Sequence, residues 1–124
     1  MQSELKISKN EEGWVIIEDQ TRIEIILHAL GDDDKKNILM ALANSPKTIN
    51  AVLTRCNIPK TSGYRKINSL INEDLIVASG FGHNDDNKRV TSYISIFSDL
   101  KIDFIKNNVT VKIRPNKNLE KSLN

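Results

Sequence analysis

The hydrophobic positions in the middle of the chain repeat with the period of an α-helix. In residues 47–76, KTINAVLTRCNIPKTSGYRKINSLINEDLI, Ile49, Val52 and Leu53 fall on one helical face. Thr48 precedes this face and can cap the helix through its hydroxyl. Pro59 restricts Ile58 to extended geometry, so the first helix ends before Ile58. A second helix is predicted to begin at residues 60–62, with an inner stripe of Gly63, Ile67, Leu70 and Ile71.

Two more helices are predicted before this pair. Thr21 and Glu24 have the spacing of a capping box and open a helix that Gly31 ends. Its apolar positions are Ile23, Ile26, Leu27 and Leu30. The next helix starts at residues 32–34, three aspartates whose charge suits the positive end of a helix dipole. They could also be read as a metal site, but they lack EF-hand spacing, so capping is the favoured interpretation. The buried stripe of this helix is Ile38, Leu39 and Leu42.

The remaining segments show strand patterns. Residues 76–78 form a short strand signal, residues 79–89 a loop rich in glycine, Asn and Asp, and residues 90–97 a strand rich in β-branched and aromatic residues. Residues 14–17 are a further strand candidate, and residues 5–7 a weaker one.

A hairpin is predicted after residue 98. Apolar and polar residues alternate over residues 100–104 and again over 109–113, and Asn107-Asn108 suits a two-residue turn. One face of this hairpin is apolar and must be covered, because an isolated hairpin is marginal in water. Either residues 14–17 and the N-terminal helix cover it, or a second subunit does. We favour a homodimer built from the N-terminal helix and this hairpin.

In order and spacing, these elements resemble the winged helix-turn-helix family, specifically the ArsR-like transcriptional regulators of archaea and bacteria. The segments LGDDDKKNILMALANSPKT, INAVLTRCNIPKTSGYRKINSLINEDLI, the loop 79–89 and RVTSYISI carry the resemblance, over residues 30–97. It implies an α+β winged helix-turn-helix with an N-terminal helix that packs across a dimer axis. A C-terminal β-hairpin extension is similar to that of some archaeal relatives.

The expected organisation has four parts. Residues 1–20 form an N-terminal strand or arm, 21–98 the winged helix-turn-helix domain, 99–114 the hairpin extension, and 115–124 a polar, disordered tail.

The composition and charge of the chain suggest where the protein is located and what kind of partner it binds. The 124 residues suffice for one domain, and a single cysteine excludes an internal disulfide. No apolar run could span a bilayer and no signal peptide is evident, so we expect a cytoplasmic protein without membrane contact. The net charge is only +2, yet residues 1–34 hold three bases against nine acids, and residues 35–124 fifteen bases against seven acids. This asymmetry indicates a polyanion partner, or an acidic part that balances a neighbouring subunit.

The outer face of the second helix has the chemistry of a surface that meets phosphates and base edges. It carries Lys60, Thr61, Ser62, Tyr64, Arg65, Lys66 and Asn68, with no acid before Glu73. We expect Ser62 and Arg65 to face the major groove of double-stranded DNA, with Lys60 and Thr61 at its mouth. Lys66 and Asn68 are expected to reach phosphate. The alternative is an ordinary solvated helix face.

Four other residues are assigned to DNA contact, and an alternative role is considered for Tyr64. Lys47 and Thr48 begin the first helix of the pair, where free N–H groups attract phosphate. The resemblance places Lys88 and Arg89 in the wing, near the minor groove, although neighbouring aspartates repel phosphate. It also places Tyr64 at the DNA surface; a core tyrosine with its hydroxyl at the rim is the alternative.

The sequence gives little support for a metal site or for catalysis. Cys56 and the two histidines stand apart, so we expect a buried structural thiol and no metal site. No nucleophile–base pair, phosphate loop or catalytic carboxylate pair is present, so we expect no enzyme and no cofactor. The expected function is sequence-specific binding of double-stranded DNA as a transcriptional regulator. The alternative is a winged-helix protein-interaction module of the transcription machinery, which should expose apolar residues on the second helix.

Overall fold

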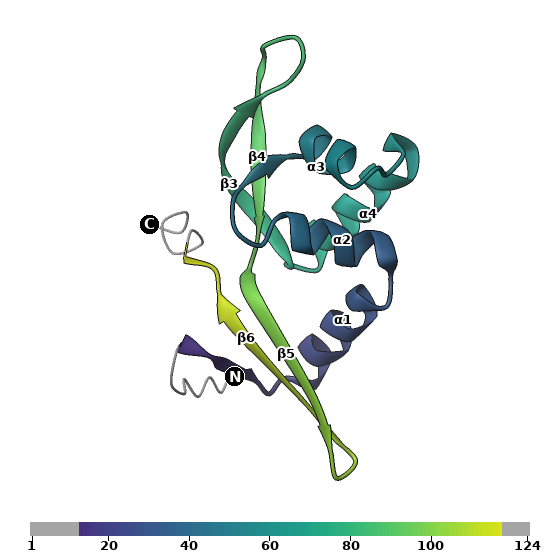
Figure 1. The fold of residues 1–124 in the computed structure, drawn as a ribbon, viewed down its shortest axis with the longest axis vertical. Coiled ribbons are helices and arrows are strands. Elements are labelled where there is room, and N and C mark those ends of the chain that lie inside the picture. The colour runs from purple at the N-terminus through teal and green to yellow at the C-terminus, as the bar shows by residue number, and fades with distance from the viewer. Residues whose placement is uncertain (1–12, 118–124) are drawn as a thin grey trace.

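The computed structural model describes residues 13–117 as a mixed α+β fold with four helices and two three-stranded antiparallel sheets. The helices are α1 (Gln20–Leu30), α2 (Asp33–Ala41), α3 (Ile49–Arg55) and α4 (Lys60–Asn72). The strands are β1 (Val15–Ile17), β2 (Lys47–Thr48), β3 (Ile76–His83), β4 (Arg89–Ser95), β5 (Phe97–Ile105) and β6 (Asn108–Pro115). One sheet has the order β2-β4-β3 and the other β1-β6-β5; they occupy opposite ends of an elongated molecule (Figure 1).

The predicted start of the first helix is wrong. Helix α1 begins at Gln20, and its N-cap is Asp19, whose carboxylate accepts a hydrogen bond from the backbone N–H of Thr21 at 3.0 Å. Thr21 therefore lies inside the helix and forms no capping box with Glu24. Asp19, two residues before the predicted cap Thr21, caps the helix instead, because Asp is as good an N-cap as Thr.

Three other predicted helix boundaries are confirmed. Gly31 is the C-cap of α1. Asp32 caps α2 by accepting from the N–H of Lys35 at 3.1 Å, and Thr48 caps α3 by accepting from the N–H of Ala51 at 3.3 Å. Each of these side chains satisfies a donor that the first turn of its helix leaves open.

The core forms where the predicted helical stripes meet. The predicted positions that are buried in it are Ile23, Ile26, Ile38, Leu39, Leu42, Val52, Leu53, Gly63, Ile67 and Leu70. Leu27, Leu30, Ile49 and Ile71 pack partly buried against it. The same cluster extends into the second sheet through Val15, Val111 and Ile113, so one core joins the two sheets.

Strand β3 is longer than the predicted residues 76–78. It continues to His83 and pairs with β4, so most of the predicted loop 79–89 is strand. The register shifts between Ala78 and Phe81, and Gly80 adopts a φ of +79°, as a β-bulge permits. The loop shrinks to residues 84–88, where the Asn84 side chain accepts from the N–H groups of Asp86 and Lys88 at 3.0 and 2.9 Å.

The predicted strand 90–97 is two strands. β4 ends at Ser95 and β5 begins at Phe97, so the chain passes from one sheet to the other at Ile96. The N–H of Ser95 donates to the Leu42 carbonyl, and that of Ile96 donates to the Leu75 carbonyl, both at 3.0 Å. The residues that follow α2 and α4 thus hold the crossing point through backbone hydrogen bonds, which a strand pattern in the sequence does not reveal.

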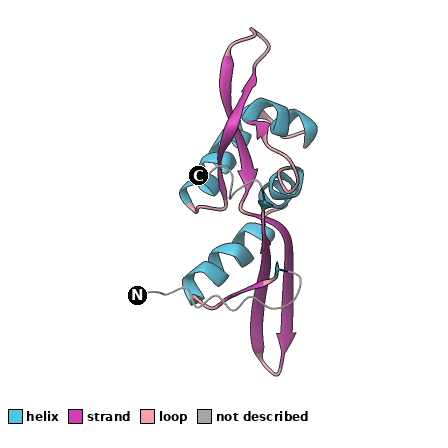
Figure 2. Ribbon diagram, turned by 90° about the vertical axis from the view of Figure 1, so that its left-hand side faces the viewer, coloured by secondary structure: helices cyan, strands magenta, loops and turns pink. Residues whose placement is uncertain are grey.

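The predicted C-terminal hairpin is present as β5 and β6. Its turn is Lys106-Asn107, with φ of 53° and 65°, one residue earlier than predicted. β1, a predicted strand, extends this sheet by pairing with the edge of β6. It therefore does not lie across the hairpin's apolar face, where α1 lies (Figure 2).

The polar tail does not begin at Pro115 as predicted. Pro115 still belongs to β6, and Asn116 is buried, with its side-chain amide donating to the Ala43 carbonyl at 2.6 Å. Its backbone N–H donates to the Ile96 carbonyl at 2.9 Å, which fastens the end of β6 to the crossing point between the sheets. The predicted strand at residues 5–7 and the tail from residue 118 lie outside the described residues.

Candidate nucleic-acid interface

Helix α4 is held against α3 by a turn that the sequence specifies closely. Asn57 takes a left-handed φ of 57°, which Asn tolerates, and the N–H of Ile58 donates to the Leu53 carbonyl at 2.9 Å. Ile58 is buried beneath the turn. A Cβ on Gly63 would lie 2.6 Å from a Leu53 methyl carbon, so glycine permits the close approach of the two helices.

The outer face of α4 is exposed, as predicted. Five of its predicted contact residues are solvent-exposed: Lys60, Thr61, Tyr64, Arg65 and Asn68. Thr61, Tyr64, Arg65 and Asn68 follow the i, i+3, i+4, i+7 spacing of one helical face. The structure therefore brings two cations, a hydroxyl, an amide and an aromatic ring onto a single surface.

Tyr64 is not a core residue. Its ring is 40% exposed, and its hydroxyl donates to the side-chain oxygen of Asn50 at 2.8 Å. This bond joins α4 to α3 at the surface, so the aromatic ring is held in a fixed place on the exposed face.

Three predicted contact residues are used inside the fold instead. Lys66 forms an ion pair with Asp32, the N-cap of α2. Lys47 donates from Nζ to the Ala41 carbonyl at 2.8 Å and to the Ser45 hydroxyl at 2.9 Å. The Ser62 hydroxyl donates to the carbonyl of the N-cap residue of its own helix at 3.5 Å. The phosphate roles predicted for Lys66 and Lys47, and the base-reading role predicted for Ser62, have no support in this arrangement.

The ion pair also shifts a titration. The hydrogen bond from the Lys66 ammonium, and then that from the backbone N–H of Lys35, hold the pKa of Asp32 below its usual value. Nearby, Lys35 Nζ donates to the Ser69 hydroxyl at 2.7 Å and forms a salt bridge with Glu73 at 3.2 Å. Arg22 donates to the Glu73 carbonyl at 2.7 Å. The inner side of α4 is thus tied to α1 and α2 by polar contacts, and its outer side is exposed.

The β3–β4 hairpin carries the second group of predicted residues. Lys88 and Arg89 are exposed, and the Arg89 guanidinium lies 4.5 Å from the centre of the Phe81 ring. Phe81 is itself 64% exposed. Sequence reasoning missed Phe81 because it fell within the predicted loop. Residues 79–83, with two glycines, gave no sign that the strand continues past residue 78.

Thr48 lies between the two groups. Besides capping α3, it pairs with Ser92 in β2–β4, and its methyl carbon would lie 2.7 Å from a Cβ on Gly82. Helix α3 lies between the hairpin and α4 in the upper half of the molecule (Figure 1). Thr48 therefore joins α3 to the β3–β4 hairpin.

Within residues 13–117, no group of three or more His, Cys, Asp and Glu side chains could hold a metal ion. Burial raises the pKa of the Cys56 thiol, whose sulfur lies 3.5 Å from the Asn37 carbonyl. None of the helices described is both long and apolar enough to cross a membrane.

The chain was compared with known proteins. No protein-family model matches it, and no curated protein and no solved structure matches it.

Proposed function

We propose that this protein is a sequence-specific double-stranded DNA-binding regulator of transcription with an ArsR-like winged helix-turn-helix. In this proposal α3 braces α4, α4 enters the major groove, and the β3–β4 hairpin is the wing on the backbone or minor groove. The observation that carries the proposal is the exposed face of α4, which presents Lys60, Thr61, Tyr64, Arg65 and Asn68 without an acid.

The dimensions and chemistry of α4 suit the major groove. The groove is about 12 Å wide and admits one helix. Arg65, near the middle of the exposed face, can donate two hydrogen bonds to one guanine, which is the commonest specific contact. Lys60 and Thr61 begin the helix, where a side chain reaches phosphate most directly. We assign base reading to Arg65 and positioning to Lys60, Thr61 and Asn68.

The hairpin suits a supporting contact. Lys88 and Arg89 supply two cations, and stacking on Phe81 restrains the Arg89 guanidinium in one direction. A restrained guanidinium loses less freedom when it binds phosphate or a narrow minor groove. Exposed Asp85 and Asp86 lie in the adjoining turn, so we place the DNA against the Arg89 side of the hairpin.

Selection of bound duplexes from a random pool, followed by titration at two salt concentrations, tests the proposal. We expect a consensus sequence, and affinity that falls steeply with salt because each neutralised phosphate releases counterions. If the protein acts as a symmetric dimer, the consensus should be an inverted repeat with half-sites about one helical turn apart. Absence of duplex binding at low salt would contradict the proposal.

A protein-interaction module is the second candidate function, and one observation favours it. Tyr64 and Phe81 are 40% and 64% exposed, and exposed aromatic rings are common anchors of protein interfaces. Under this alternative Phe81→Ala should abolish partner binding while duplex DNA binds weakly and without a consensus. The same titration therefore separates the two functions.

A further inference from the structure

Strand β5 has one unpaired edge. In the sheet order β1-β6-β5, one side of β5 pairs with β6, and no strand in the described part of the chain pairs with its other side. Ile105 and Asn108 flank a two-residue turn, so they form a hydrogen-bonded pair, and such pairs alternate along an antiparallel hairpin. The N–H and C=O groups of Leu100, Ile102 and Phe104 therefore point away from β6. We call these backbone groups the outer edge of β5.

The other edges of the two sheets have features that oppose the addition of a strand. Strand β1 pairs with residues 111–113 of β6, and β2, at an edge of the first sheet, has only two residues. Strand β3 is also an edge strand, but a register shift between Ala78 and Phe81 interrupts it. Short strands and bulges are common means of keeping further strands from pairing. Between Asp99 and Ile105 the register of β5 with β6 has no such irregularity.

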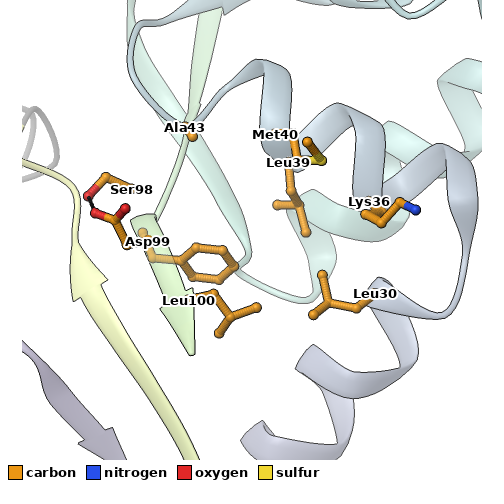
Figure 3. Close-up of a pocket in the computed structure, with 9 residues that line it drawn as sticks. Leu30, Lys36, Leu39, Met40, Ala43, Ser98, Asp99 and Leu100 are labelled. Atoms are coloured by element: carbon orange, nitrogen blue, oxygen red, sulfur yellow. Dashed lines mark hydrogen bonds between the residues drawn. The ribbon is translucent and has the colours of Figure 1, made fainter. Parts of the chain in front are cut away.

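The half of β5 nearer its turn projects beyond α1. At the base of the strand, Leu100 points toward Leu30 of α1, and both line an apolar pocket (Figure 3). Helix α1 covers this part of the hairpin, and the tip extends beyond it (Figure 2). Eleven helical residues span about 16 Å, whereas the nine residues of β5 span about 30 Å, so α1 is too short to cover the whole strand. Ile102 and Phe104 are accordingly 39% and 73% exposed.

The side chains beside the outer edge determine what kind of strand it suits. On one face, Ile102 and Phe104 are joined by Val109, which pairs with Phe104 and is 42% exposed. On the other face, Lys101 lies directly opposite Lys112, and like charges in this position repel each other. The ion pairs of the described residues include neither lysine. A strand with apolar side chains on the first face and carboxylates on the second would match both.

We propose that the outer edge of β5 binds an extended, acidic segment of a partner protein, which joins the sheet as a further strand. Apolar residues alternate with Asp or Glu in this segment, because successive side chains of a strand point to opposite faces. Backbone hydrogen bonds to the outer edge supply affinity, and the side chains of the two faces supply specificity. A carboxylate beside Lys101 offsets the repulsion between Lys101 and Lys112.

The charge of the hairpin favours an acidic partner over other occupants. Residues 101–112 carry three lysines against Asp103, a net charge of +2. A lysine on an edge strand opposes pairing with uncharged or basic strands, whereas it attracts an acidic one. Two copies of the hairpin would bring like net charges together, so a second copy of the chain is the less suitable occupant.

Titration with a synthetic peptide tests the proposal on the full chain without DNA, so the result does not depend on the proposed function. The probe alternates valine with glutamate, and the matched control peptide alternates valine with lysine. We expect the glutamate peptide to slow hydrogen exchange at the N–H groups of Leu100, Ile102 and Phe104, and the lysine peptide to bind at least about tenfold more weakly. Equal binding of the two peptides, or slowed exchange in α4 or β3 instead, would overturn the proposal. So would slow exchange at the outer edge in the chain alone, with a dimer in sedimentation, because a second copy would then occupy it.

Two substitutions test the charge and the backbone of the outer edge separately. Lys101→Glu, at an exposed position, should reverse the preference, so that the lysine peptide binds more tightly than the glutamate peptide. Ile102→Pro removes an outward N–H, which an edge strand tolerates, so binding should fall at least about tenfold while the chain stays folded. Ile102→Thr keeps this N–H and is the control, which should retain more of the binding. Unchanged preference in Lys101→Glu, or equal binding by the two Ile102 variants, would contradict strand addition at β5.

Discussion

The two long hairpins of this protein have similar frameworks and different surfaces. β3–β4 and β5–β6 each pair strands of seven to nine residues, and each exposes one phenylalanine. In β3–β4, Phe81 lies beneath the Arg89 guanidinium. In β5–β6, Phe104 pairs with Val109 and has Ile102 beside it on the same face.

This difference shows that the neighbours of an exposed aromatic ring determine which kind of partner it suits. A ring that carries a guanidinium presents positive charge to a polyanion while shielding its own apolar surface. A ring among aliphatic side chains presents only apolar surface, which is stabilised by contact with another apolar surface. We therefore propose that the first hairpin contacts nucleic acid and the second a protein surface.

The largest expected effect is on the free energy of unfolding, and it compares a buried with an exposed position of the β5–β6 hairpin. Ile113→Ala, in the core, should lower the free energy of unfolding by about 2–5 kcal/mol, because the lost methyl groups leave a cavity. Val109→Ala, on the same face of the same strand but 42% exposed, should change it by about 0.5 kcal/mol. Urea denaturation at low protein concentration measures both. Equal losses would mean that the tip is also buried within the single chain.

The next largest effect, on affinity for duplex DNA, tests whether α4 and neither hairpin recognises the base sequence. Arg65→Ala should weaken binding to a selected duplex by about 1–3 kcal/mol and relax preference at one base position. Arg55→Ala, which alters another exposed arginine at the end of α3, is the control and should leave sequence preference intact. Competition binding with point-substituted duplexes measures the preference. If Arg65→Ala keeps full specificity, α4 does not read the sequence.

Much of the fold follows from local patterns. The stripes Ile38/Leu39/Leu42 and Ile67/Leu70 were predictable because a helix repeats its buried face every three to four residues. The caps at Asp32 and Thr48 were predictable because side-chain oxygens satisfy the open N–H groups of a helix start. Short-range rules decide these features, and the chain obeys them.

What could not be predicted depends on contacts between distant residues. The chain changes sheet at Ile96, whose N–H donates to the Leu75 carbonyl. Strand β2 is a strand only because Lys47 and Thr48 pair with β4. For the candidate site, the sequence identified the exposed face of α4 but not that Lys66 is paired with Asp32, thirty-four positions away. Whether a cation on a helix is free is a property of the packed structure.

The two hairpins should also differ in salt dependence. Arg89→Ala should reduce the slope of log affinity against log salt by about one, as the loss of one phosphate contact does. Lys101→Ala and Lys112→Ala remove cations of the β5–β6 hairpin and should leave this slope unchanged. Duplex titrations over a range of salt concentrations measure all three. A reduced slope for Lys101→Ala would place DNA on the second hairpin and contradict the division of roles.

The smallest expected effect is on the free energy of unfolding. It tests whether a cation paired within the fold, Lys66, stabilises it, in contrast to an exposed cation such as Arg89. Lys66→Met keeps the aliphatic stem and removes the charge that pairs with Asp32. At about pH 7 we expect a loss of about 1 kcal/mol or less in the free energy of unfolding, because the pair is partly exposed. Lys36→Met, which removes a pair with the nearly fully exposed Asp33, is the control and should cost less.

The sign of the pH dependence makes this last prediction specific. The pKa of Asp32 is lowered in the folded state, chiefly by Lys66, so the unfolded state binds this proton more readily. The resulting stabilisation is present above the ordinary pKa of 3.8 and is lost as the pH falls through the lowered value. The gap between the unaltered chain and Lys66→Met should therefore close in acid. A gap that persists once Asp32 is protonated would mean that the Lys66 charge stabilises the fold without Asp32, and would contradict the ion pair as the cause.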